Sequence, residues 1–185
     1  KTEDCDTTVS SSLTSQLECS DNETLNVATS GSVIKTGADT IHAKNHSNVT
    51  IDNKGTISAS TNQAINMQHA VNTTVTNSGT IEATLRNAIL MDGDNADNNT
   101  INNSGTLKAG KKQVILATNS ENTTIINSGS IESTNSSNPN TNGINYYNTS
   151  GSAINGATIT NSGTIFAYGT GIRFGTQGNA NKTVN

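Results

Sequence analysis

The chain has 185 residues, of which 30% are hydrophobic, 3% aromatic and 13% charged, with no Trp and a net charge of −4. Globular domains contain about 45–50% apolar residues when Gly is counted, so this composition argues against an enzyme domain with a wide apolar core. A negative net charge without a basic cluster argues against nucleic acid as a partner. No apolar run approaches the ~20 residues of a membrane-spanning helix.

Residues 1–22 differ from the rest of the chain because they hold both cysteines. We interpret them as an N-terminal cap over an otherwise open sheet end. A disulfide between Cys5 and Cys19 would close a short loop, with a stabilisation of roughly 3 kcal/mol in the chain-entropy model. Such a bond implies an oxidising compartment. We expect either a removed signal peptide or the boundary of a longer chain before Lys1.

Residues 23–185 are predicted to be a repeat array, because Asn, Ser and Thr supply 80 of the 185 residues and similar words recur. The word TVTNSGTIEA at 74–83 returns as TITNSGTIFA at 158–167. A shorter apolar word, such as AILM at 88–91, follows most copies. The period is 24, 24, 26, 24 and 34 residues between the successive glycines Gly31, Gly55, Gly79, Gly105, Gly129 and Gly163. Periods of this size are typical of solenoids.

Each word alternates apolar and polar residues, which is strand periodicity. Gly and Asn tolerate the left-handed backbone of tight corners. Three short strands in each turn of the chain predict an all-β fold, a right-handed parallel β-helix. The strand centres are Ile51, Val75, Ile101, Ile125 and Ile159 for the first strand, Ile57, Ile81, Leu107, Ile131 and Ile165 for the second, and Ile65, Ile89, Ile115, Ile144 and Ile172 for the third.

The narrow interior of a β-helix explains why so few hydrophobic residues suffice. Stepping by two from Ile51 places Asn53, Ile57 and Ala59 inside. A buried amide needs hydrogen-bond partners, so we expect the recurring Asn to stack as a structural ladder. Its members are Asn53, Asn77, Asn103, Asn127 and Asn161.

Two coils are longer than the others. The first insertion carries Asp92, Asp94 and Asp97, a weak candidate for calcium because carboxylates are calcium ligands. It lacks the downstream Glu of a calcium loop, which favours a solvated turn, and no Cys/His zinc spacing occurs, so no cofactor is expected. The second insertion, at 133–142 and 147–157, is the best candidate for a recognition loop.

Some apolar side chains are expected to point outward and to form a candidate contact surface. A contiguous apolar patch would indicate a partner, and the alternative is contact with a loop or the cap. We expect Tyr146 to point inward and Tyr147 outward. The candidate surface comprises Leu90, Leu116, Ile126, Tyr147 and Phe166.

The repeated Asn-Ser-Gly-Thr-Ile words, over about residues 24–175, resemble the passenger domains of bacterial autotransporters. This resemblance implies export through the periplasm to the bacterial cell surface and a C-terminal outer-membrane barrel beyond residue 185. The repeat stops mid-coil at Asn185, which suggests a truncated array. Family members include adhesins, self-associating factors and some proteases or toxins. No nucleophile motif of the Gly-x-Ser-x-Gly type is present, nor are clustered carboxylates for sugar cleavage, so we expect a non-enzymatic protein.

Four functions follow in order of preference. The first is a surface adhesin or self-associating scaffold whose partner is a second copy, a host or cell-surface protein, or a glycan. The second is a structural stalk or fibre subunit that assembles end to end. A polysaccharide-binding β-helix is third. An ice-binding face is last, because regular Thr-x-Thr strands occur only at Thr74-Val75-Thr76 and Thr158-Ile159-Thr160.

Overall fold

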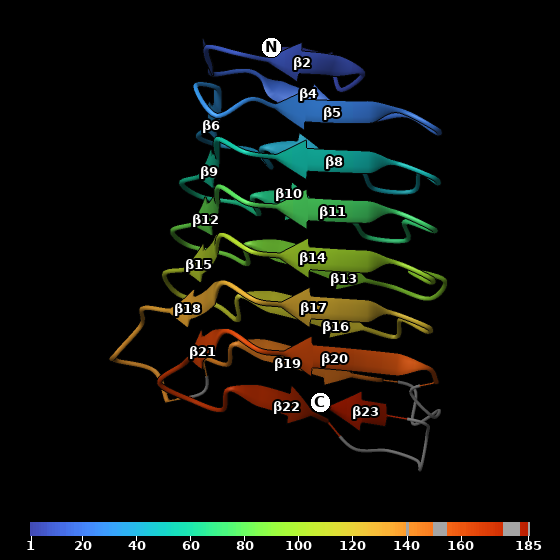
Figure 1. The fold of residues 1–185 in the computed structure, drawn as a ribbon, viewed down its shortest axis with the longest axis vertical. Coiled ribbons are helices and arrows are strands. Elements are labelled where there is room, and N and C mark those ends of the chain that lie inside the picture. Colours follow the sequence, from blue (N-terminus) through green and yellow to red (C-terminus); the bar gives the residue numbers. More distant parts are fainter. Residues whose placement is uncertain (140, 150–154, 176–181, 185) are drawn as a thin grey trace.

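The computed structural model describes residues 1–139, 141–149, 155–175 and 182–184, and it shows a parallel β-helix of about seven coils. In Figure 1 the chain runs right to left along the front and returns behind, while it descends from the N-terminal end. This path is clockwise for an observer at the N-terminal end, so the β-helix is right-handed, as predicted. No described residue belongs to a helix that could span a membrane.

Sheet A is the wall at the back of Figure 1. Its inward column stacks Ile41, Ile65, Ile89, Ile115 and Ile144 through the parallel register. Each of these isoleucines is fully buried. The sheet contains β1 (Thr2–Asp4), β4 (Gln16–Glu18), β7 (Ile41–His42), β10 (Ile65–Asn66), β13 (Ile89–Asp92), β16 (Ile115–Thr118), β19 (Ile144–Tyr147) and β22 (Ile172–Phe174).

Sheet B forms the front wall (Figure 1). Its inward column confirms the predicted register, because Ile51, Val75, Ile101, Ile125 and Ile159 pair in succession. A slip of one residue would turn every one of these side chains to solvent. The sheet contains β2 (Thr7–Val9), β5 (Thr24–Val27), β8 (Thr50–Asn53), β11 (Thr74–Asn77), β14 (Thr100–Asn103), β17 (Thr124–Asn127), β20 (Ala157–Asn161) and β23 (Lys182–Val184).

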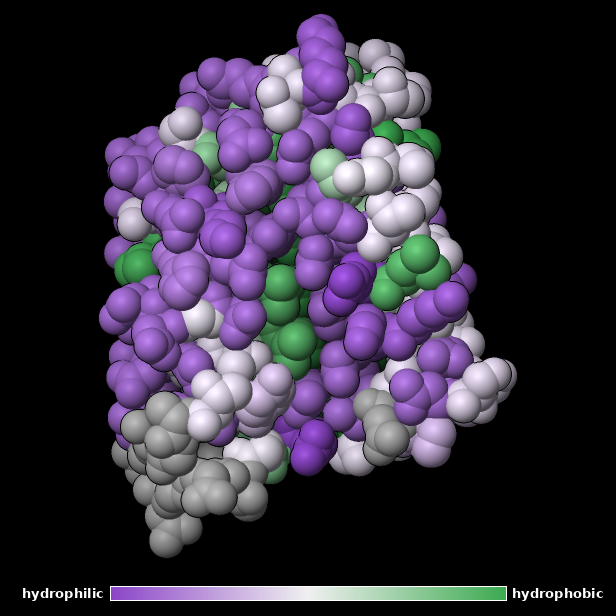
Figure 2. All heavy atoms as spheres, turned by 180° about the vertical axis from the view of Figure 1, so that it is seen from behind, coloured by the Kyte–Doolittle hydropathy of each residue, from purple (hydrophilic) through white to green (hydrophobic). Residues whose placement is uncertain are grey.

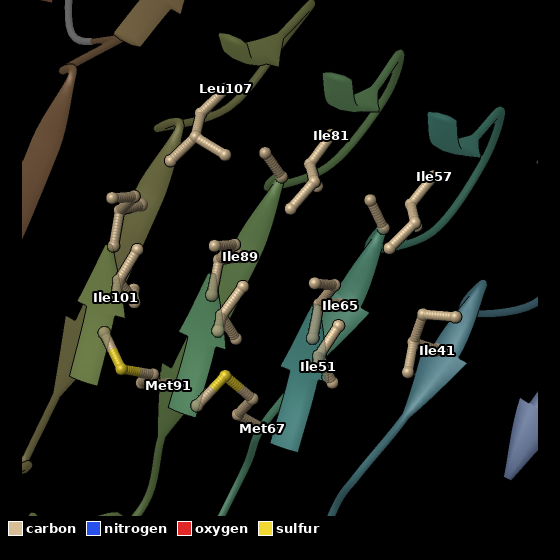
Figure 3. Close-up of a cluster of buried hydrophobic side chains, with 14 of the residues drawn as sticks. Ile41, Ile51, Ile57, Ile65, Met67, Ile81, Ile89, Met91, Ile101 and Leu107 are labelled. Carbon is tan, nitrogen blue, oxygen red and sulfur yellow. The ribbon is translucent and has the colours of Figure 1, made fainter. Parts of the chain in front are cut away.

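Sheet C is the third wall, and its inward aliphatic side chains meet those of sheets A and B in one layered core. Figure 3 shows these layers, with Ile57, Ile81 and Leu107 opposite the sheet A and B isoleucines and with Met67 and Met91 at one corner. The sheet contains β3 (Ser12–Leu13), β6 (Ser32–Lys35), β9 (Thr56–Ala59), β12 (Thr80–Ala83), β15 (Thr106–Ala109), β18 (Ser130–Ser133) and β21 (Thr164–Phe166).

Residues 1–22 form strands of the β-helix itself. Strands β1, β2 and β3 make a short first coil, and each pairs in parallel with the strand of the next coil. Cys5 and Cys19 are fully buried and are joined by a disulfide. The covalent link therefore ties the first coil to the second, and the N-terminal segment continues the three sheets.

The interior Asn residues form a directional ladder along the corner between sheets B and C. The Nδ2 atom of each residue donates to the Oδ1 atom of the next over 2.7–2.8 Å, from Asn53 to Asn161. From Asn53 to Asn127, each Nδ2 also donates to two turn carbonyls, as Asn103 does to Gly105 and Ser130, and Asn161 donates to the carbonyl of Gly163. Among the described residues, the Oδ1 atom of Asn53 has no hydrogen-bond partner. The coil before it places Val27 in register with Asn53, and valine has no polar hydrogen to donate.

Glycine next to this ladder permits the coils to stack closely. A Cβ atom built on Gly105 would lie 2.2 Å from the carbonyl oxygen of Gly79 and 2.6 Å from the carbonyl carbon of Ser78. Backbone atoms cannot move aside as a flexible side chain can. The recurrence of glycine at this corner therefore follows from the distance between coils.

At the corner between sheets A and B, the chain turns through Asn residues in a left-handed backbone conformation. At one exposed position in each of five coils an Asn adopts a positive φ, between 51° and 66°, and in four of these coils the residue three positions earlier has a positive φ as well. Asn tolerates this left-handed conformation better than other non-glycine residues. Side-chain amides link neighbouring coils along part of the column, as from Asn72 to Asn48 and from Asn48 to Asn22. The column comprises Asn22, Asn48, Asn72, Asn98 and Asn122.

Candidate functional site

The outer face of sheet A is more recessed than those of sheets B and C, where hollows of about 100 Å³ and 200 Å³ lie beside Ile126 and Lys108, against about 370 Å³ on sheet A. Outward side chains on three of its strands are nearly buried: the exposed fraction is 5% for Asn66, 6% for Leu90 and 3% for Asn145. At outward positions of sheets B and C, the exposed fraction is 43% for Ile126 and 49% for Phe166. Figure 2 shows hydrophobic atoms lying deep between hydrophilic rims on the rear face. We call this recess the sheet A groove.

One wall of the groove is held by amides at the corner that leads from sheet C into sheet A. Asn87 and Asn142 are nearly buried at equivalent positions before β13 and β19. Asn87 Nδ2 donates to the carbonyl oxygen of Gln113 over 2.7 Å, and Asn142 Oδ1 accepts from the amide of Thr170 over 3.0 Å. These bonds clamp successive coils and fix the height of the wall.

Polar groups at the N-terminal end of the groove satisfy one another. Asn66 Nδ2 donates to Asp39 Oδ2 over 2.8 Å, and Asn66 Oδ1 accepts from the amide of Gln68 over 3.0 Å. Gln68 Nε2 in turn donates to Asp92 Oδ2 over 3.3 Å. A network closed on itself has little capacity left for a ligand, so this end is structural.

The middle of the groove floor is apolar. Leu90 and Leu116 occupy outward positions in directly paired residues of β13 and β16. The sequence predicts both to be outward, but Leu90 is nearly buried and Leu116 half-buried. Leu90 therefore points outward as expected but is nearly buried, because the rims of the groove rise above the side chain.

The C-terminal end of the groove widens into a pocket of about 370 Å³. Asn145 lies on its floor, and Arg173 follows Asn145 in register on the next strand. Tyr147 is half-buried at the end of β19 and contributes its side chain to the wall. The lining residues are Gln113, Asn145, Tyr147, Asn148, Arg173 and Gly175.

Asn145 is the one described member of this pocket with a buried polar atom that lacks a hydrogen-bond partner among the described residues. That atom is its Oδ1 atom. Buried polar atoms are almost always paired in folded proteins. This oxygen therefore has the capacity to accept a hydrogen bond from a ligand.

Behind the pocket, Tyr146 points into the interior as predicted and is fully buried. Its hydroxyl donates to the carbonyl oxygen of Ser120 over 2.6 Å. Burial raises the pKa of Tyr146 to about 12, and the nearby charges of Asp97 and Glu121 act in the same direction. The ring lies 6.0 Å from that of Phe174, centroid to centroid, and fixes the strand that carries Asn145 and Tyr147.

The five residues of the candidate contact surface do not form one patch. Leu90, Leu116 and Tyr147 belong to sheet A, whereas Ile126 lies on sheet B and Phe166 on sheet C. Only the sheet A members share a concave surface. The structure thus separates the five residues, and it places only Leu90, Leu116 and Tyr147 along the sheet A groove.

The acidic turn does not assemble a metal site from the described residues. Asp92 accepts a hydrogen bond from Gln68, and Asp97 Oδ1 accepts one from the amide of Glu121 over 2.7 Å. The backbone carbonyl of Asp94 accepts one from His69 Nδ1 over 3.0 Å. Within the described ranges, no three His, Cys, Asp or Glu side chains are grouped so that they could hold a metal ion.

The expected recognition loop is only partly described. Tyr147, expected on the insertion, is instead the last residue of β19, while residues 140 and 150–154 lie outside the described residues. The sequence interpretation did not single out Asn145 or Arg173. The repeat register contained a signal for both, because the two residues follow Leu90 and Leu116 in the same outward column. It also missed Tyr168, exposed beside Phe166.

Comparison of the chain with protein-family models, with curated proteins and with solved structures finds no match. The groove and its pocket therefore have to be interpreted from their own chemistry.

Proposed function

We propose that this chain is a non-enzymatic binding scaffold of adhesin type, exported to the bacterial cell surface as an autotransporter-like passenger. The observation that carries the proposal is the sheet A groove, which is recessed, rimmed by amides and open at one end. Ligand sites in proteins are concave and combine apolar surface with a few placed polar groups. Through this groove the scaffold contacts a cell-surface component or another cell.

The buried disulfide supports the export part of the proposal. The bond between Cys5 and Cys19 ties the first two coils together. Disulfides form and persist in secreted, periplasmic and surface proteins. Low charge and long polar faces suit a protein that works outside the cell, where weak contacts add over many copies.

A stalk or fibre subunit is the second candidate function. Sheets B and C favour it, because their outward columns repeat Thr from coil to coil, as in Thr50, Thr74 and Thr100, and because their hollows, of about 100 Å³ and 200 Å³, are smaller than the pocket on sheet A. A stalk needs only such regular walls. The stalk function does not explain why the outer face of sheet A differs from those of sheets B and C.

Display of the chain on bacteria through a fused outer-membrane anchor tests the proposal. Cells that carry the intact chain are expected to aggregate or to attach to a surface. Leu116→Asn with Tyr147→Ser, in the groove, should reduce attachment about fivefold or more, as expected when a central contact is lost. The control Ile126→Asn changes an equally apolar residue that is 43% exposed on sheet B, and it should leave attachment unchanged.

The proposal fails if the intact chain causes neither aggregation nor attachment, and the stalk function then takes its place. It also fails if Ile126→Asn lowers attachment as much as the groove variant does. Equal amounts of each variant on the cell surface, measured with an antibody, exclude a difference in folding or export.

A further inference from the structure

The pocket at the C-terminal end of the sheet A groove includes one buried amide, that of Asn145, with an oxygen that no described residue contacts by a hydrogen bond. Asn145 is 3% exposed, and its Oδ1 atom has no partner among the described residues. The opposite end of the groove closes its amides into a network from Asp39 to Asp92. The same outward column is therefore satisfied at one end and open at the other, which is the pattern expected of a binding site.

Arg173 gives this pocket its charge. It is exposed and pairs in register with Asn145. None of the ion pairs found in the described part of the chain involves Arg173. The planar guanidinium group matches a carboxylate with two parallel hydrogen bonds. An anionic ligand would therefore find a cation here that forms no ion pair with a carboxylate of the described residues.

The rest of the pocket suits a sugar. The ring of Tyr147 offers an apolar face beside a hydroxyl, and aromatic rings supply contact area in a fixed geometry. The amide of Gln113 carries both donors and an acceptor, which is what the hydroxyl groups of a sugar require. Leu116, one strand away in the floor, continues the apolar surface toward the middle of the groove.

We propose that this pocket binds an acidic saccharide, a chain of sugars that carry carboxylates, with one carboxylate on Arg173 and sugar hydroxyls on Asn145 and Gln113. The inference rests on the proposed function, since it names the ligand class of the same groove. A volume of about 370 Å³ is at the small end of ligand pockets. The pocket therefore holds one end of the chain, and the adjoining sugars lie over the leucines.

Calorimetry on the complete 185-residue chain tests the ligand class. Three probes of similar length are compared: tetragalacturonate, neutral cellotetraose and the acidic peptide tetraglutamate. Tetragalacturonate is expected to bind about tenfold more tightly than either of the others, because only it offers both the carboxylates and the sugar hydroxyls.

Two variants place the site. Arg173→Gln removes the cation and should weaken tetragalacturonate binding about tenfold. Asn145→Asp keeps the size of the side chain but adds a charge that repels a carboxylate, and should weaken binding at least as much. The matched control Arg86→Gln removes the same charge from an exposed corner residue and should leave binding unchanged. Circular dichroism of each variant verifies that the strands are intact.

Several results would overturn the inference. They are the absence of tetragalacturonate binding, equal binding of cellotetraose or tetraglutamate, and a loss with Arg86→Gln as large as that with Arg173→Gln. Displayed cells that attach through the groove, while tetragalacturonate does not bind, would refute the ligand class and keep the proposed function. Tetragalacturonate binding by a chain that causes neither attachment nor aggregation would do the reverse.

Discussion

Asn103 is a middle rung of the interior ladder, and its Nδ2 atom donates hydrogen bonds to three acceptors. It donates to Asn127 Oδ1 over 2.7 Å and to the carbonyl oxygens of Gly105 and Ser130. It also accepts from Asn77 Nδ2 over 2.8 Å. The sequence predicts this column because the Asn recurs at one inward position. It does not predict the missing donor for Asn53, which depends on which residue of the preceding coil lies in register.

Replacement of this rung is expected to cost stability. Asn103→Leu leaves buried amide and carbonyl groups without partners, and should lower the free energy of unfolding by about 1–3 kcal/mol. The control is Asn102→Thr on the outward side of the same strand, which should change it by less than about 0.5 kcal/mol. Urea denaturation of both variants gives the comparison. Equal midpoints for the two variants would refute the structural role of the ladder.

Gly105 stands at a corner where two coils approach closely. Gly105→Ala places a methyl group against the backbone of Gly79 and Ser78, and should lower the free energy of unfolding by about 1–3 kcal/mol, the usual cost of overpacking. Gly171→Ala serves as the control, because the nearest atom to its added Cβ is 3.7 Å away. Thermal unfolding followed by circular dichroism distinguishes the two. A Gly105→Ala protein as stable as Gly171→Ala would contradict the close stacking.

Because of Tyr146, the free energy of unfolding depends on pH in the alkaline range. Its pKa is about 12 in the folded chain, against about 10 in an unfolded one. The buried neutral phenol therefore contributes stability below pH 10, and that contribution is lost as the pH rises from about 10 to 12. The free energy of unfolding of the intact chain should fall more steeply over this range than that of Tyr146→Phe. Parallel pH profiles for the two proteins would contradict this assignment.

At the scale of the element, the first two coils depend on a covalent link. The bond joins residues 14 positions apart, and closing a loop of this size stabilises by about 3 kcal/mol in the chain-entropy model. In a solenoid each coil contacts only its neighbours, so Cys5→Ala with Cys19→Ala should raise hydrogen exchange in β1 to β6. Exchange in β11 to β18 should stay as in the intact chain. A uniform rise along the chain, or no rise, would contradict this local role.

The groove also arises at the scale of the element, from the corners beside sheet A, and this explains why the sequence did not reveal it. Alternation predicts that Leu90 and Ile126 both point outward, and both do. Their exposure differs because the corners beside sheet A are longer and amide-bonded, as at Asn87 and Asn142. Alternation specifies the direction of a side chain, whereas exposure depends on the height of the walls around it.

At the scale of the whole molecule, the period of about 24 residues was sufficient to predict the fold. Inward columns such as Ile51 to Ile159 follow from alternation and glycine spacing alone. The site could not be predicted in the same way, because the register places Asn145 and Arg173 in a column that keeps no single residue type from coil to coil, namely His42, Asn66, Leu90, Leu116, Asn145 and Arg173. Positions whose residues do not follow the repeat are those at which a solenoid can acquire a binding site.

The central claim is that one face of the β-helix, the sheet A groove, makes the contacts. A single cysteine is placed at Gln113 in the groove, at Asn102 on sheet B or at Lys108 on sheet C, and each is coupled to a bulky polyethylene glycol maleimide on displayed cells. Attachment of the labelled cells is the one measurement needed. The groove label is predicted to abolish attachment, whereas the sheet B and sheet C labels leave it intact. Attachment that survives the groove label, or that is lost only with a label on sheet B or C, would contradict the claim.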